Sequence, residues 1–188
     1  QAGYNKTSTG DDNVFIGRQS GYFVTSGTLN TFVGAASGPN STAGATGSSN
    51  TAIGYAAGSS ITSGSNNTAV GQQALAFNTT ASENTAVGYQ SLNTNVTGAG
   101  LTAVGFQAGY SSANGAGTGY NTFVGRLSGY SLTTATDTIF IGNATGYSTT
   151  TGSNNTAVGS VSFYSNTTGT QNTVFGREAL FSNTTASN

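Results

Sequence analysis

The stretch Asn67-Thr68-Ala69-Val70-Gly71 decides the fold, because versions of it return ten times along the chain. The common form is Asn-Thr-(Ala/Phe)-(Val/Ile)-Gly. The sequence number rises by 17 from one closing glycine to the next, except for two rises of 20, into Gly54 and into Gly125. A nearly constant period of this kind indicates a chain built from stacked copies of one small unit. The closing glycines are Gly17, Gly34, Gly54, Gly71, Gly88, Gly105, Gly125, Gly142, Gly159 and Gly176.

Each copy of the motif is predicted to form a short β-strand. A motif of four or five residues, bounded by Gly and Asn, is too short for a helix, and Thr, Val, Ile and Phe favour strands. Stacking pairs each strand in parallel with the next copy, while the glycine suits a corner that needs positive φ or a close backbone approach. We therefore expect an all-β fold, a parallel β-solenoid or β-roll of about eleven coils and a length of about 50 Å.

The repeat covers the chain from end to end. The two longer steps extend only the polar stretches at 39–50 and 111–121, where loop insertions are tolerated best. No linker is visible, so residues 1–188 are expected to form a single repeat domain. Residues 1–4 match residues 107–110, and the last residues match a stretch that precedes another motif. We therefore expect this domain to be a segment of a longer solenoid array.

Alternation along each strand places the threonine and the last apolar residue of the motif on one side. Because this side of the strand carries Val or Ile beside the threonine, we expect it to face the core. The middle residue then faces outward, and phenylalanines at this position would form an interchain stripe: Phe15, Phe32, Phe123 and Phe140. Packing such stripes together predicts a homo-oligomer, most simply a trimer. The threonines form a ladder: Thr31, Thr51, Thr68, Thr85, Thr102, Thr122, Thr156 and Thr173.

Composition excludes several classes of function. A net charge of −1 with four basic residues gives no phosphate-binding stripe, so no nucleic acid is expected. No apolar run approaches the length of a transmembrane helix, so no membrane insertion is expected. The absence of His and Cys removes most metal ligands and acid–base groups. We therefore expect no enzyme, no catalytic residues, no cofactor and no metal.

The remaining charged and aromatic residues have ordinary interpretations. Asp11 and Asp12 beside Asn13 are read as a solvated turn rather than a calcium site. Three arginines follow a motif glycine directly, and surface solubility is favoured over an anion- or glycan-binding column: Arg18, Arg126 and Arg177. Five recurring tyrosines are read as packing residues rather than a sugar-binding strip: Tyr22, Tyr110, Tyr130, Tyr147 and Tyr164.

Residues 66–75 and 84–92 resemble the repeats of bacteriophage tail fibres and related bacterial surface proteins. They are also similar to the head repeats of trimeric autotransporter adhesins, whose core reads Ser-Val-Ala-Ile-Gly. The resemblance covers essentially the whole chain. It implies a parallel β-roll, three chains side by side, and a role in an adhesive fibre at a virion or extracellular surface, with a cell-surface glycan or receptor as partner. Adhesin head repeats are shorter, and here Thr replaces their first inward aliphatic residue.

Two alternatives to a fibre segment stay open. If the threonine side of the sheet were exposed and flat, its regular hydroxyls and methyls could order water, as in an ice-binding solenoid. The aliphatic residues on the same side favour a core instead, and Val14 and Ile139 interrupt the threonine column. A self-assembling extracellular filament is the other alternative. A glycan hydrolase needs paired carboxylates at a suitable distance, and carboxylates are too sparse here.

Overall fold

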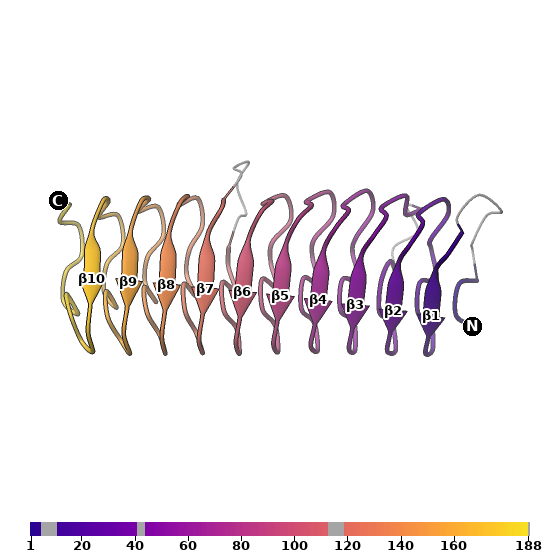
Figure 1. Cartoon of the computed structure of the whole chain (residues 1–188), viewed down its shortest axis with the longest axis horizontal. Coiled ribbons are helices and arrows are strands. Elements are labelled where there is room, and N and C mark those ends of the chain that lie inside the picture. Colours follow the sequence, from indigo (N-terminus) through magenta and orange to yellow (C-terminus); the bar gives the residue numbers. More distant parts are fainter. Residues whose placement is uncertain (5–10, 41–43, 113–118, 188) are drawn as a thin grey trace.

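The computed structural model describes residues 1–4, 11–40, 44–112 and 119–187. This part of the chain contains ten β-strands of three residues each and no helix. The strands lie side by side in chain order, forming one parallel sheet along the length of the molecule (Figure 1). They are Val14–Ile16 (β1), Thr31–Val33 (β2), Thr51–Ile53 (β3), Thr68–Val70 (β4), Thr85–Val87 (β5), Thr102–Val104 (β6), Thr122–Val124 (β7), Ile139–Ile141 (β8), Thr156–Val158 (β9) and Thr173–Phe175 (β10).

The architecture confirms the predicted parallel β-solenoid. Consecutive strands pair directly, and the chain between them makes one turn, so the solenoid has about nine turns rather than the eleven coils expected from the sequence. Equivalent motif residues are in register throughout, including across the two longer steps from β2 to β3 and from β6 to β7. The two longer steps therefore leave the pairing of the strands unchanged.

The motif glycine forms the corner that ends each strand. All ten corner glycines have φ between 114° and 142°. At Gly54, a Cβ atom would also lie 2.6 Å from the carbonyl oxygen of Gly71 in the next coil. Glycine is needed for two reasons, since the backbone is in a region that L side chains rarely adopt and the next coil leaves no room for a methyl group.

The middle residue of each strand points into the coil, and our expectation that it points outward is wrong. Phe32, Phe123 and Phe140 are at most 1% exposed, and Phe15 is half-buried against Phe32 with ring centroids 5.5 Å apart. These four phenylalanines belong to this chain's own core and form no stripe for a neighbouring chain. Each turn of the solenoid encloses enough volume for one apolar column, so each chain buries its own motif phenylalanines.

The core is filled in two complementary ways, which depend on the size of the middle strand residue. Where this residue is Phe, as at Phe140, the residue six positions later is glycine, as at Gly146. Where it is Ala, as at Ala69 and Ala157, a large apolar side chain often occupies that later position, as at Leu75 and Phe163. Both positions point into the same core: Leu75 and Phe163 are fully buried, and a Cβ atom on Gly146 would clash with the ring of Phe140.

A buried ladder of asparagines runs beside the strands. The motif asparagine precedes eight of the ten strands and is at most 1% exposed at Asn30, Asn50 and Asn67. The Asn67 amide donates to the side-chain oxygen of Asn50 (3.0 Å) and to the Ala81 carbonyl (2.9 Å). The Asn67 side-chain oxygen in turn accepts the backbone N–H of Asn84 at 3.1 Å. Buried polar groups are stabilising only when paired in this way, so the asparagine of the motif links coil to coil rather than only ending a loop.

Candidate functional site

The outward side of the ten-stranded sheet is a regular surface, and we call it the strand face. Its first column contains Val14, Thr31, Thr51, Thr68, Thr85, Thr102, Thr122, Ile139, Thr156 and Thr173. Its second column contains Ile16, Val33, Ile53, Val70, Val87, Val104, Val124, Ile141, Val158 and Phe175. The prediction that both columns face the core is wrong. The structure places them outside, because the intervening strand residues fill the core instead.

The threonine column is regular because the strands pair in register. Thr31, Thr51, Thr68, Thr85, Thr102 and Thr122 form an uninterrupted run over six strands, and Thr156 and Thr173 form a second run. Parallel strands lie about 4.8 Å apart, and alternate residues along one strand are separated by about 6.6 Å. From β2 to β7 the strand face is therefore a two-dimensional array of alternating hydroxyl and aliphatic groups, and none of its residues in any strand is charged.

The hydroxyls of the strand threonines are free. Among the described residues, none of them has a hydrogen-bond partner within the protein. A different column of threonines in the polar part of the coil behaves in the opposite way. Thr62, Thr133 and Thr150 each donate their hydroxyl to a carbonyl of the following coil at 3.0–3.1 Å. One threonine column therefore holds the coils together, and the other presents its hydroxyls to solvent.

Aromatic side chains form a separate column in the later coils. The rings of Tyr110, Tyr130, Tyr147, Tyr164 and Phe181 stack with centroids 5.1–5.2 Å apart and interplanar angles of 5–11°. The rings of Tyr130, Tyr147 and Tyr164 have a neighbouring ring on both faces, so they offer no free face on which a sugar could stack. Burial and the neighbouring Tyr147 and Tyr110 raise the pKa of Tyr130 above its usual value.

The arginines do not form an anion-binding column. Arg126 lies over the ring of Phe106 at 5.7 Å, and Arg177 forms an exposed ion pair with Glu178 at 2.6 Å. Arg18 donates to the side chain of Gln19 at 3.3 Å. Each guanidinium is thus engaged by a neighbour in its own or the adjacent coil, and no two of them converge on one point.

The acidic residues of the described part of the chain do not gather in one cluster. Asp11 and Asp12 are exposed, and no group of three or more His, Cys, Asp or Glu side chains comes together among residues 1–4, 11–40, 44–112 and 119–187. Over these same ranges the structure has no helix long and apolar enough to span a membrane.

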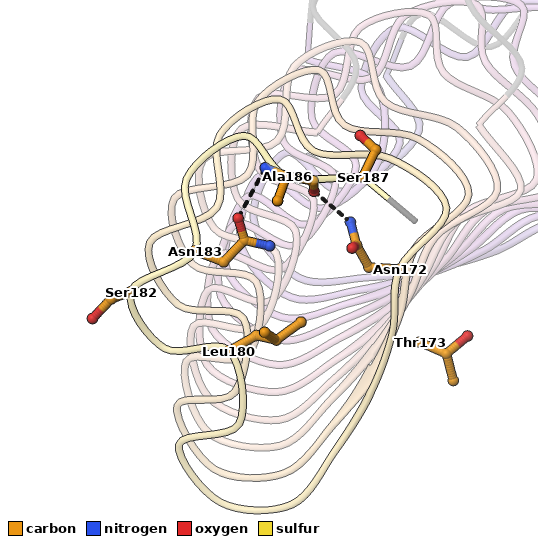
Figure 2. Close-up of a pocket in the computed structure, with 7 residues that line it drawn as sticks. All are labelled: Asn172, Thr173, Leu180, Ser182, Asn183, Ala186 and Ser187. Atoms are coloured by element: carbon orange, nitrogen blue, oxygen red, sulfur yellow. Dashed lines mark hydrogen bonds between the residues drawn. The ribbon is translucent and has the colours of Figure 1, made fainter.

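A hollow lies at the last described coil, lined by Asn172, Thr173, Leu180, Ser182, Asn183, Ala186 and Ser187. Figure 2 shows Leu180 pointing into the coil and Thr173 pointing away from it on the opposite side. Leu180 is 48% exposed, whereas the equivalent Leu75 and Leu92 are fully buried by the coil that follows them. The hollow is the interior of a coil on which no further coil is stacked, and it has no convergent charged groups.

Comparisons with protein-family models, with curated proteins and with solved structures gave no match to this chain.

Proposed function

We propose that this chain is a non-enzymatic structural segment of an extracellular or virion-surface fibre, such as the shaft or head of a phage tail fibre or bacterial adhesin. The observation that carries the proposal is the unbroken ladder of ten in-register parallel strands (Figure 1). Every coil makes the same backbone contacts with the next, so a repeat of this kind builds a stiff rod of any length. Such a rod positions an attachment site away from the surface that carries it.

Side chains strengthen the contact between successive coils. The buried asparagine ladder and the hydroxyls of Thr62, Thr133 and Thr150 all bond across the coil boundary. Buried hydrogen bonds of this type contribute about 0.5–1.5 kcal/mol each. Because they recur along the chain, they resist local opening of single coils, which is where proteases cut a rod-like protein.

The resemblance to adhesin heads also supports a homotrimer, but a different surface has to hold it together. The motif phenylalanines are buried within one chain and are not accessible to another. We place the contact along the aromatic column of Tyr110, Tyr130, Tyr147, Tyr164 and Phe181. Leu180 and Ser182, which flank Phe181 in the sequence, lie on the wall of the coil opposite Thr173 (Figure 2). Packing these half-exposed ring edges together leaves the strand face outward.

Light scattering on a sizing column tests the assembly, and small-angle X-ray scattering tests the shape. We expect a molar mass three times 18.6 kDa and the profile of a rod. Tyr147→Lys should reduce the mass to that of one chain, whereas Thr151→Lys, at an exposed position of the same coil, should leave it unchanged. A monomer contradicts the trimer, and a compact particle contradicts the rod. A mass that rises steadily with concentration would favour a self-assembling filament instead.

A further inference from the structure

We propose that the strand face binds ice. This function goes beyond the fibre role and does not depend on it, since the strand face belongs to a single chain. The occupant we assign is the water lattice of an ice crystal, and the array of free threonine hydroxyls and aliphatic groups is the site.

The first argument is the contrast between the two threonine columns. The hydroxyls of Thr62, Thr133 and Thr150 are used within the protein, whereas those of the strand threonines, such as Thr68 and Thr85, have no described protein partner. A free hydroxyl on a surface binds water. When it repeats at every strand, the bound waters repeat with it, so the surface carries a row of water positions with the period of the sheet.

The second argument is rigidity. Threonine is β-branched and has restricted χ1 freedom, and the threonines inside the six-strand run, such as Thr68 and Thr85, have a threonine on the strand to either side. The corner glycines and the asparagine ladder fix the backbone on both sides of the strand. Holding water in fixed positions costs up to about 2 kcal/mol of entropy per molecule. A rigid array that binds water already ordered in an ice crystal avoids much of this entropic cost. The binding free energies of many weak contacts then add along the six-strand run.

The third argument is the chemistry of the face compared with other occupants. It has no charged residue, so it does not attract nucleic acid, acidic polymers or a charged protein patch. The stacked aromatic column lies elsewhere, and Phe175 in β10 is the single ring on the strand face, so this face has no row of rings on which a polysaccharide could stack. A second copy of the chain is the remaining competitor. A dry contact between two such faces would leave threonine hydroxyls unpaired unless they bonded across it, at about 1–3 kcal/mol for each unpaired group. A hydrated partner satisfies all of them.

The experiment measures the gap between melting and freezing of a small ice crystal, and the enrichment of the chain in growing ice. Thr85→Lys places a long charged side chain in the middle of the six-strand run. Thr80→Lys makes the same replacement at an exposed threonine in the polar part of the preceding coil and serves as the matched control. Circular dichroism confirms that both variants keep the fold, and light scattering gives the mass of each.

We expect the unaltered chain to show a freezing gap and to be enriched several-fold in ice over a bystander protein. Thr85→Lys should lose more than half of the gap, while Thr80→Lys should keep it. Ile139→Thr should increase the gap, because it joins the threonine run of β2–β7 to that of β9 and β10. Exclusion of the unaltered chain from ice, or equal gaps for the two lysine variants, overturns the proposal. It is also overturned if Thr85→Lys, but not Thr80→Lys, dissociates an oligomer, since the strand face is then an interface between copies.

Discussion

Some coils fill the core with a phenylalanine in the middle of the strand, and others with a large side chain six positions later. Two substitutions should convert a coil of the first kind into one of the second. Phe140 is fully buried, with ring neighbours Phe123 and Phe163 at 6.1 and 6.2 Å. Phe140→Ala therefore leaves a large cavity and should cost about 4 kcal/mol. For a chain of this length, that corresponds to a fall in Tm of about 8–16 °C. The replacement combines a small middle residue with Gly146, so neither position supplies a large side chain.

Adding Gly146→Leu should restore much of the loss, because it recreates the arrangement of Ala69 with Leu75. Burying a leucine side chain contributes about 1.5–3 kcal/mol. The backbone at Gly146 is left-handed, which costs a leucine about 1 kcal/mol. Leu75 adopts the same conformation, with φ of 50°. The net gain in the Phe140→Ala background should be about 0.5–2 kcal/mol. With Phe140 in place, the same leucine clashes with the ring and should cost about 1–3 kcal/mol.

The assay is urea unfolding followed by far-ultraviolet circular dichroism for the four chains of the double-mutant cycle. A coupling of about 3 kcal/mol is expected, with Gly146→Leu changing sign between backgrounds. Ile141→Ala is the control, since Ile141 is the next residue but points outward and is 38% exposed. It should cost about 1 kcal/mol or less. If Ile141→Ala were the more damaging change, or if Gly146→Leu had the same effect in both backgrounds, the inward direction of the middle residue would be refuted.

Three other predictions concern the coil-to-coil contacts and the tyrosines. Asn67→Ala should destabilise the chain by about 3 kcal/mol in urea unfolding, because it leaves buried donors and acceptors of the ladder unpaired; Asn66→Gly, at an exposed residue with φ of 59°, should be close to neutral. Gly54→Ala should lower Tm by more than about 5 °C in a calorimetric scan, since the new methyl group would meet the Gly71 carbonyl; an unchanged Tm would show that the corners can open. The third prediction is a loss of stability at high pH. Because the pKa of Tyr130 is raised in the folded state, its contribution is fully present below the unfolded tyrosine pKa of about 10 and is lost as the pH rises through the folded value. Unfolding midpoints measured on both sides of this pH, with Tyr130→Phe as the control, check it; an equal loss in that variant would assign the effect to another group.

The solenoid and its register follow from the sequence because the repeat is strict. A motif that returns at a constant period with the same polar and apolar order can pair with itself only in register, and glycine at its end marks the corner. The two longer steps leave the motif and its pairing unchanged, as expected of loop insertions. The repeat pattern overestimates the coil number, because fragments of the repeat at either end count as coils but add no strand.

The buried role of the motif asparagine is absent from the sequence-based predictions, although the sequence contains a signal for it. A residue that only ends a loop can vary among Asn, Gly, Asp and Ser, yet Asn precedes the strand threonine in most copies. Where Leu101 or Thr138 stands at this position, the amide-to-amide ladder is interrupted, but the backbone N–H of the substituted residue still donates to the asparagine before it. A fixed polar residue at one point of most coils is the sign of a buried ladder, whose bonds become evident only once the coils are stacked.

The direction of the strand side chains is the point on which function depends, and alternation alone could not decide it. Side chains of a strand alternate between the two sides of the sheet, so either set can face the core. The core could hold the threonine and the last apolar residue of the motif, or it could hold the middle Ala or Phe. The sizes of two positions within each coil decide between these alternatives. In seven of the ten copies a large residue at one position goes with a small one at the other, as in Phe140 with Gly146 and Ala69 with Leu75; Ala52 with Gly58 and Ala103 with Gly109 are small at both. Two positions exchange volume in this way only if both fill the same enclosed space, because residues facing solvent have no shared volume to conserve. The middle residue must therefore face the core, and the threonines and aliphatics beside it must face outward. The same inference removes the phenylalanine stripe as an interface and provides the free hydroxyls on which ice binding depends.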